Sequence, residues 1–328
     1  MGLKELSLHI LPPIAVDGMR WLLNLTRKDR VVVGQRLRVP YGDFFLECDS
    51  THHLPQILVS LPNFGRRLAD VVLALKVDQP CVIDVGANIG DTALLLARFA
   101  PGAKVLCVEG DSSFMADLKR NTSQIAGVTI AQAFLSDRTA VIRGKLVTKD
   151  GTGHVVLDEN GDALQVETLD NLLASSPQFS SPHVIKIDTD GYDAAILRGA
   201  QKVLATVKPV VFYEWHPGHY NMAGESVSGH AEFLSRLGYE GFLIFTNRGE
   251  LLLSMRNPGP EIWNSLAYFS SQRRTFDDLH YDVAAFPRQW SSAWKDLSKC
   301  QLETGIQSFA GLLGQLTAAA GTAIEIIR

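Results

Sequence analysis

The sequence has 328 residues, of which 46% are hydrophobic and 20% are charged. A chain of this length and composition buries a large core, which excludes a disordered or low-complexity protein and predicts one catalytic-size domain with an appendage. Its formal net charge of -4 provides no positive field for a polyanion, so nucleic acid is not an expected partner.

The four cysteines, Cys48, Cys81, Cys107 and Cys300, are too scattered for a disulfide scaffold or a structural zinc site. Free thiols are typical of a reducing compartment. The first residues also lack the uninterrupted apolar run of a signal peptide. We therefore expect a cytoplasmic protein.

Residues 1–79 carry no motif and are predicted to form an N-terminal cap or packing segment. Helices are expected around Val16–Thr26 and over Leu68–Val77, and β-like runs are expected at Val31–Val39 and Phe44–Cys48. Because nothing in this segment has the pattern of a catalytic or cofactor site, we look for chemistry farther along the chain.

Between residues 80 and 270, short apolar runs alternate with helical stretches. Strands are expected at Cys81–Val85, Lys104–Glu109, Val128–Phe134, His183–Asp188, Pro209–Glu214, Gly241–Thr246 and Leu251–Ser254, with one more near Ser265–Ser270. Residues 138–166 interrupt the alternation with β-rich, glycine-rich sequence, which indicates a small hairpin insertion. The alternation predicts an α/β domain whose mostly parallel sheet is covered by helices on both faces.

Residues 271–328 are predicted to form a C-terminal helical extension. Thr304–Ile324 has no charge, but its glycines and polar side chains break the run of about 20 apolar residues that a membrane-spanning helix needs. Apolar residues recur there every three or four positions, which is typical of an amphipathic helix. We expect this helix to dock on the protein or on a second subunit of a homo-oligomer, with peripheral membrane contact as the alternative.

Polar side chains follow five of the predicted strands. They are Asp84 to Asn88, Glu109, Ser136 with Asp137, Asp188 with Asp190, and Glu214 with His216. Right-handed crossovers place the carboxyl ends of parallel strands on one edge of the sheet, and ligands bind at that edge. Five polar strand ends on one edge therefore predict a site.

The first of these strand ends has the pattern of a nucleoside site. Gly86 and Gly90 allow a tight turn between strand and helix and a close approach of the backbone to a ligand. Glu109 ends the next strand, 19 residues after Gly90, where a carboxylate can accept both hydroxyl groups of a ribose. The glycine turn and the carboxylate of Glu109 together predict a cofactor that contains a nucleoside.

Charge distinguishes two cofactors of this kind. The dinucleotide fingerprint has a glycine where this chain has Asn88, which leaves less room for a diphosphate. Asp84 and Asp91 add negative charge, which repels a pyrophosphate and suits a sulfonium with an ammonium group. These features favour S-adenosylmethionine over NAD.

The same residues resemble a known family. VIDVGANIGDTALLLARFAPGAKVLCVEGD is similar to the first motif and second-strand acid of class I S-adenosylmethionine-dependent methyltransferases, and VETLDNLL, VIKIDTDG and Glu214-Trp-His216 are similar to blocks of the FkbM family. The resemblance covers roughly residues 80–245. Asp190 stands where the family pattern has Glu, and Gly110 where it usually has Pro.

The resemblance implies a Rossmann-like class I methyltransferase fold with a mostly parallel seven-stranded sheet. It also implies residue roles. Gly86, Ala87 and Asn88 would flank the methionine part of S-adenosylmethionine, Glu109 would hold the ribose, Ser136 and Asp137 would approach the adenine, and Asp84 and Gly90 would complete the cofactor site.

The ends of the fourth and fifth strands supply candidate catalytic residues. Methyl transfer to a hydroxyl needs alignment and removal of a proton, and Asp188, Glu214 and His216 are the candidate bases. Carboxylate and imidazole groups also suit a divalent metal, but no tight ligand spacing supports one, so we expect a site without metal. Lys186 lies in an apolar strand and is expected to pair with a carboxylate.

The sequence therefore predicts a methyltransferase that acts on a small-molecule or glycan acceptor. The family implies O-methylation of a hydroxyl on a sugar, glycan precursor or secondary metabolite. Two alternatives stay open: an NAD-dependent oxidoreductase, and a methyltransferase-like binding module without catalytic activity that is anchored through residues 302–328.

Overall fold

A computed structural model of the protein describes residues 36–41, 43–61, 64–149, 151–272 and 280–299. The helix expected around Val16–Thr26 and the amphipathic stretch Thr304–Ile324 lie outside these residues. In the part of the chain that the structure describes, no helix is long and apolar enough to cross a membrane.

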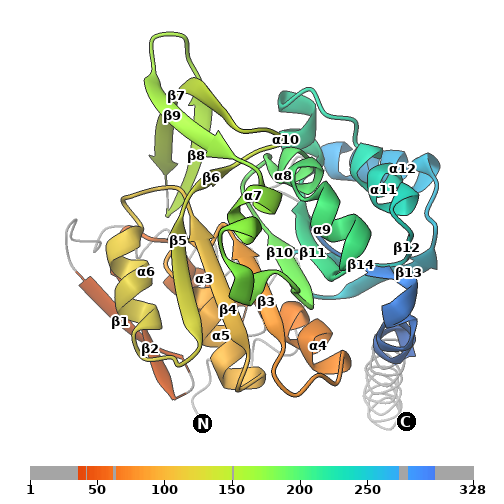
Figure 1. The fold of residues 1–328 in the computed structure, drawn as a ribbon, viewed down its shortest axis with the longest axis horizontal. Coiled ribbons are helices and arrows are strands. Elements are labelled where there is room, and N and C mark those ends of the chain that lie inside the picture. Colours follow the sequence, from red (N-terminus) through yellow and green to blue (C-terminus); the bar gives the residue numbers. More distant parts are fainter. Residues whose placement is uncertain (1–35, 42, 62–63, 150, 273–279, 300–328) are drawn as a thin grey trace, which may run out of the picture.

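The core of the protein is an eight-stranded sheet with the order β13-β12-β14-β11-β10-β3-β4-β5 (Figure 1). Its strands are β3 (Cys81–Val85), β4 (Lys104–Glu109), β5 (Val128–Gln132), β10 (Val184–Ile187), β11 (Val210–Trp215), β12 (Tyr239–Thr246), β13 (Leu251–Arg256) and β14 (Tyr281–Pro287). The five strands from β5 to β11 are parallel, and β14 pairs antiparallel with both β11 and β12. The fold is thus the predicted α/β fold with a mixed sheet.

The far edge of the sheet differs from the prediction. The stretch Ser265–Ser270 lies in a helix, α12 (Pro260–Gln272), and the strand that enters the sheet there is β14. β13 adds an eighth strand at the edge, one more than the seven implied by the resemblance. The sheet therefore continues past residue 270, into the stretch assigned from the sequence to a C-terminal extension.

Helices cover both faces of the sheet. On one face they are α7 (Leu169–Ala174), α8 (Asp193–Gly199), α9 (Gln201–Thr206), α11 (Gly229–Arg236) and α12, and on the other α4 (Arg66–Ala74), α5 (Asp91–Phe99), α6 (Met115–Thr122) and a helix over residues 291–299. Two large apolar clusters fill the spaces between sheet and helices, because the strand side chains alternate between the faces. Ile83 and Ile185 contribute to one cluster and Val82 and Val184 to the other.

The N-terminal segment packs on the outside of this core. It contains the hairpin of β1 (Arg36–Tyr41) and β2 (Phe44–Asp49) and the helix α3 (Leu54–Ser60). Asn121, which is fully buried, fixes the segment: its Oδ1 accepts from the Glu47 amide, and its Nδ2 donates to the carbonyls of Glu47 and Ile89. The segment is thereby joined to the glycine turn that follows β3.

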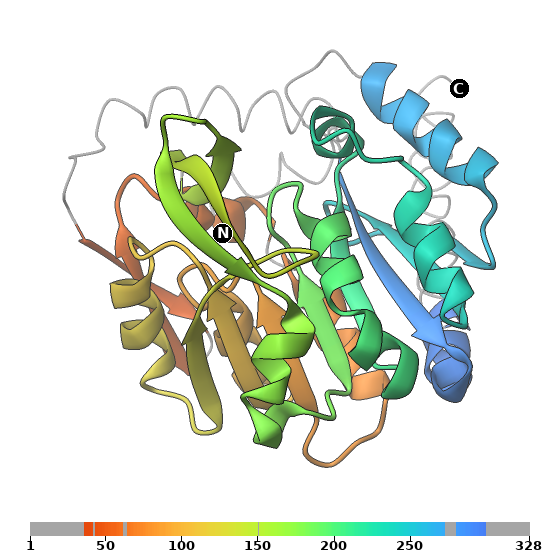
Figure 2. The same ribbon diagram turned by 45° about the horizontal axis from the view of Figure 1, so that its top comes forward.

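A second sheet forms an arm above the carboxyl edge of the first (Figures 1 and 2). It contains β6 (Phe134–Leu135), β7 (Ala140–Lys149), β8 (Thr152–Leu157) and β9 (Asp162–Glu167) in the order β6-β9-β7-β8. The stretch expected as a hairpin thus has three strands, and β6 joins them as a fourth. The strand expected at Val128–Phe134 breaks before Phe134, because β6 leaves the main sheet to pair with β9.

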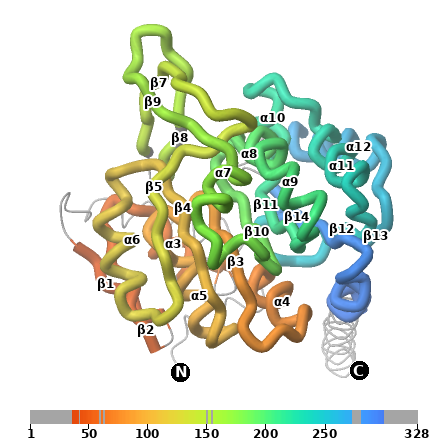
Figure 3. The backbone as a smooth tube through the Cα atoms, viewed as in Figure 1, coloured from red at the N-terminus to blue at the C-terminus, as the bar shows by residue number. Residues whose placement is uncertain are grey.

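Asp170, in the VETLDNLL block, has a structural role. Its two carboxylate oxygens accept hydrogen bonds from the backbone amides of Lys202 and Val203, at 2.7 and 2.9 Å. These amides begin α9 and have no partner within that helix. The Thr168 side chain caps α7 in the same way, through the Asn171 amide. The block therefore fixes two helix starts below the arm, in the region traced in Figure 3.

Candidate active site

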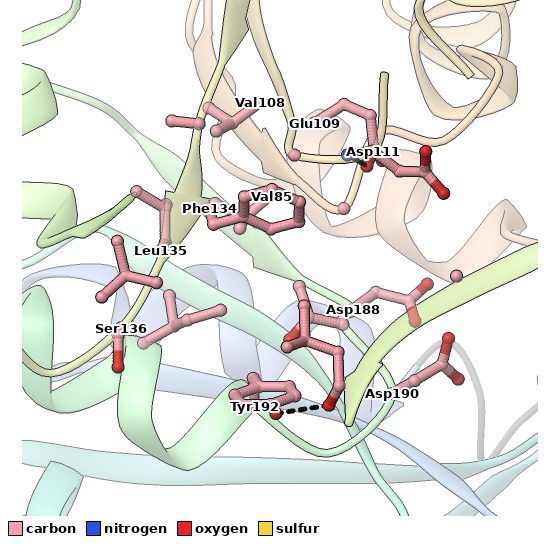
Figure 4. A pocket seen from close by; sticks show the side chains of 18 of the residues that line it. Val85, Val108, Glu109, Asp111, Phe134, Leu135, Ser136, Asp188, Asp190 and Tyr192 are labelled. Carbon is pink, nitrogen blue, oxygen red and sulfur yellow. Dashed lines mark hydrogen bonds between the residues drawn. The ribbon is translucent and has the colours of Figure 1, made fainter. Parts of the chain in front are cut away.

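A cavity opens between the carboxyl edge of the main sheet and the arm (Figure 4). It has about 810 Å³ of empty space, a volume that includes open solvent at its mouth. Residues from the ends of β3, β4 and β10 form its floor, and arm residues Ile142, Leu146, Gly153, Val155 and Val166 form its roof. Figure 4 shows the acidic side chains in two groups, Glu109 with Asp111 and Asp188 with Asp190.

Glu109 lies at the end of β4 with its carboxylate held by two backbone amides. Oε2 accepts from Asn88 at 2.8 Å and Oε1 accepts from Asp111 at 2.7 Å. Burial raises the pKa of Glu109, although the hydrogen bonds from these amides act in the opposite direction. Each oxygen keeps further acceptor capacity, so the carboxylate is fixed in place for a ligand with two hydroxyl groups.

Asn88 joins three parts of the protein. Its backbone amide donates to Glu109, as described above. Its Nδ2 donates to the Gly151 carbonyl in the arm at 2.8 Å, and its Oδ1 lies 3.1 Å from His52 Nε2 in the N-terminal segment. Asn88 has a positive φ of 48°, which asparagine tolerates better than most residues. Its side chain therefore connects the glycine turn after β3 to the arm and to the N-terminal segment.

Gly86 allows a close approach between two strand ends. It has a φ of 78°, and a Cβ atom built on it would lie 1.9 Å from the Asp188 carbonyl oxygen. A close contact that requires this glycine is therefore the one with the backbone after β10. This contact holds the first and fourth strand ends together at the floor of the cavity.

An apolar surface lies beyond Glu109. Phe134 packs directly over Gly110, where a Cβ atom would lie 2.3 Å from its ring. Leu135 and Ser136 continue this side of the cavity. The departure from the family pattern, Gly110 in place of proline, thus makes room for an aromatic ring at the end of the cavity where an adenine is expected.

Two further hydrogen bonds hold the arm over the cavity. Tyr192 donates its hydroxyl to the Val155 carbonyl at 2.6 Å, which Figure 4 marks, and Thr148 donates to Asp111 Oδ2 at 3.1 Å. With the bond from Asn88 to Gly151, the arm is attached at three places around the cavity. The arm therefore covers the space in which a cofactor would lie.

Beneath the floor, Lys186 lies between two carboxylates. Its Nζ is 3.1 Å from Asp84 Oδ1 and 3.3 Å from Asp188 Oδ2, which confirms that this lysine pairs within the sheet. Asp84 is fully buried, and burial raises its pKa, although the attraction of Lys186 acts in the opposite direction. For Asp188, burial is outweighed by Lys186 and the pKa is lowered. Asp188 is therefore an ionised group at the cavity floor.

Glu214, the residue before the end of β11, lies in strongly negative surroundings. Burial and the nearby charges of Asp188, Asp193 and Asp190 raise its pKa well above the ordinary value. Asp282 stands directly opposite Glu214 on β14, and burial and Asp188 raise the Asp282 pKa to about 7. Several carboxyl groups thus share this edge of the sheet.

The histidine candidate has a different position. His216 precedes α10 (Pro217–Met222), and its Nδ1 accepts a hydrogen bond from the His219 amide at 3.1 Å. The two imidazole rings stack with 3.9 Å between their centroids. With Nδ1 accepting this bond, Nε2 is the ring nitrogen left to face other groups.

The structure brings part of the predicted cofactor set to the cavity. Gly86, Asn88, Glu109 and Ser136 line it, together with Asp188, whereas Asp84, Ala87, Gly90 and Asp137 do not. Asp84 and Ala87 are buried beneath the turn, and Gly90 packs against α6. Asp137 lies farther out, where its carboxylate is 3.7 Å from Arg198.

Sequence reasoning missed much of the cavity wall. The missed residues are Asp111, Phe114, Phe134, Thr189, Tyr192 and the arm residues of the roof. Asp111 and Phe134 follow strands β4 and β5 closely, so their positions near strand ends were an available signal. No local pattern marks the arm residues, because their contact with the cavity depends on how a separate sheet folds back.

The sheet and its two helical layers form a Rossmann-like class I methyltransferase fold, with the cavity at the carboxyl edge of the sheet. Residues 84–240 match the model of the family described as the methyltransferase FkbM domain. Over these residues the resemblance inferred from the sequence is confirmed. No curated protein matches the chain in sequence.

Several solved structures are similar to it. Methyltransferase FkbM from Methylobacillus flagellatus is 15% identical with a TM-score of 0.40, and the match covers 64% of this chain and 44% of that one. Precorrin-6y C5,15-methyltransferase from Geobacter metallireducens is 14% identical with a TM-score of 0.36, over 67% and 86% of the two chains. TYW2 from M. jannaschii, in complex with AdoMet, is 13% identical with a TM-score of 0.38, over 78% and 89%.

Proposed function

We propose that the protein is an S-adenosylmethionine-dependent O-methyltransferase that acts on a hydroxyl of a sugar, glycan precursor or other secondary metabolite. One observation carries the cofactor assignment: Glu109, held by two backbone amides, lines the cavity that the arm covers. The acceptor class rests on the family, whose methyltransferase domain this chain contains.

The charges of the cavity suit the cofactor. The ribose hydroxyls would bind Glu109, and the adenine would lie along Phe134 toward Ser136. The methionine part would then lie toward Gly86 and Asp188, where carboxylates attract an ammonium and a sulfonium. A nicotinamide dinucleotide fits less well, because the Asn88 side chain occupies the turn with bonds to the arm and to His52.

Asp188 is the base that this arrangement favours. It is ionised, it lines the cavity, and Lys186 holds one of its oxygens in place. In the reaction the acceptor oxygen attacks the methyl carbon, the carbon–sulfur bond breaks with its electrons moving to sulfur, and Asp188 takes the hydroxyl proton. Glu214 and His216 would orient the acceptor beside it.

The choice of cofactor is tested by thermal denaturation. S-adenosylhomocysteine at 100 times its Kd is expected to stabilise the folded protein by about 2.7 kcal/mol and so to raise its melting temperature. NAD at the same concentration is expected to leave the melting temperature unchanged. Stabilisation by NAD alone would instead support an oxidoreductase. If neither nucleoside shifts the melting temperature of folded protein, the proposed function is wrong.

Replacing Asp188 with asparagine tests the base. The variant keeps the size of the side chain and loses the proton acceptor, so transfer of labelled methyl groups should slow by about 10²–10⁴-fold. Its affinity for S-adenosylhomocysteine should survive, because Glu109 and the turn are untouched. Asp162→Asn, on an exposed part of the arm, is the matched control. A wild-type rate for Asp188→Asn would exclude Asp188 as the base.

A further inference from the structure

Three potential metal ligands meet beside the cavity. Asp190 follows β10, Glu214 lies near the end of β11 and His219 lies in α10, and one ligand atom from each lies within 4.8 Å of the other two. Two ligands of one ion are separated by at most twice the metal–ligand distance, about 4.2 Å for Mg²⁺ and about 5 Å for Ca²⁺. The three side chains can therefore share one ion after small adjustments of their rotamers.

The surroundings of this cluster favour a positive charge. Asp282 stands directly opposite Glu214 in the antiparallel pair of β11 and β14, an arrangement that like charges destabilise. The ammonium group of Lys186 is already placed between Asp84 and Asp188. The cluster thus concentrates carboxylates at one edge of the sheet, and a cation would relieve their repulsion.

A buried carboxylate next to the cluster also favours a bound cation. Asp193 is 2% exposed, and its Oδ1 has no hydrogen-bond partner among the described residues, while Oδ2 accepts from the Gly191 amide at 3.2 Å. Its charge acts on Glu214 from the side of α8. An orphaned buried oxygen is costly, and a cation or a water held by one would offset part of that cost.

We propose that Asp190, Glu214 and His219 bind a divalent cation of the Mn²⁺ or Mg²⁺ class. Two carboxylates and one imidazole form a donor set that Mn²⁺ accepts, and the three remaining octahedral positions are left for water and substrate oxygens. The site differs from the expectation of a metal-free enzyme, and it uses a histidine, His219, to which the sequence assigned no role.

The cation identifies a substrate class, and this part of the inference rests on the proposed function. Asp190 also lines the cofactor cavity, so an ion bound to it would lie next to Asp188 (Figure 4). An acceptor with a second oxygen next to the reacting hydroxyl, such as a vicinal diol, would bind the ion through both oxygens. The ion would lower the pKa of the hydroxyl, and Asp188 would take its proton as the methyl group moves from sulfur to oxygen.

Manganese alone tests the site. Full-length protein, stripped with chelator and titrated with MnCl₂ while free Mn²⁺ is followed by electron paramagnetic resonance, should bind one ion per chain. Glu214→Gln and His219→Asn should each weaken binding by about tenfold or more, since even changes in outer-shell partners cost 10–100-fold. Glu240→Gln, whose carboxylate pairs with Arg288 on another part of the surface, should bind as the wild type does.

Two readouts separate this inference from the proposed function. Absence of saturable Mn²⁺ binding, or equal binding by wild type, Glu214→Gln and His219→Asn, overturns the metal site. Circular dichroism of each variant excludes loss of fold as the cause of weaker binding. S-adenosylhomocysteine binding is measured on the same samples without metal, so a protein that binds the nucleoside and not Mn²⁺ keeps its proposed function and loses the cation.

Discussion

Replacing Gly86 with alanine is expected to destabilise the protein by about 2–5 kcal/mol. A left-handed backbone costs a residue with a Cβ atom about 1–2 kcal/mol, and overpacking adds about 1–3 kcal/mol. Here the added atom would lie 1.9 Å from the Asp188 carbonyl oxygen, which is backbone and cannot rotate away. A loss of this size lowers the melting temperature by about 10 °C in a domain of this length.

Gly224 supplies the matched control. It has a similar φ of 71°, but a Cβ atom built on it meets nothing within 4 Å. Gly224→Ala should therefore show the backbone strain alone, about 1–2 kcal/mol, and the difference between the variants measures the contact of the two strand ends. Equal losses in urea denaturation would mean that this contact is not tight, and would remove the physical reason for a glycine at the floor of the cavity.

Much of the site follows from the position of polar residues after apolar strands. Asp84, Glu109, Asp188 and Glu214 each lie in or directly after a run of buried strand residues, and parallel strands place such ends on one edge. This part of the fold was predictable because a strand buried on both faces is apolar throughout. A charged residue at its end therefore stands out.

The far edge of the sheet was less predictable. Tyr281–Pro287 forms β14 between β11 and β12, so its partners precede it by 35 to 74 residues. The apolar residues of α12 form a short run that fits either a strand or a helix segment, and periodicity alone does not distinguish them. Pairing across the sheet decides which segment becomes the strand, and the local sequence does not contain that information.

The role of Asn88 also depends on contacts between residues that are far apart in the sequence. From the sequence it is a polar substitute for a glycine, expected to face the ligand. Its side chain instead bonds to Gly151, 63 residues later, and to His52, 36 residues earlier. A residue in the glycine turn after β3 thereby holds the arm that covers the cavity. These hydrogen bonds form only when the turn, the arm and the N-terminal segment pack together.

Replacing Glu109 with glutamine is expected to raise the Kd for S-adenosylhomocysteine by about 10²-fold. Two hydrogen bonds from ribose hydroxyls to a charged carboxylate contribute about 1.5–3 kcal/mol each, and a neutral amide keeps only part of this. The new NH₂ group would also face the amide of Asn88 or of Asp111, both of which are donors. Ligand and turn are thus both disturbed by a change that preserves side-chain size.

Isothermal titration with S-adenosylhomocysteine measures this effect, and Glu159→Gln, an exposed residue between β8 and β9, is the control for loss of a charge. The melting temperature of the unliganded variant separates two causes. If affinity falls while stability is kept, Glu109 acts mainly on the ribose. If both fall together, the carboxylate acts mainly by fixing the turn through Asn88. Unchanged affinity would remove Glu109 from the cofactor site, and with it the observation on which the assignment of S-adenosylmethionine depends.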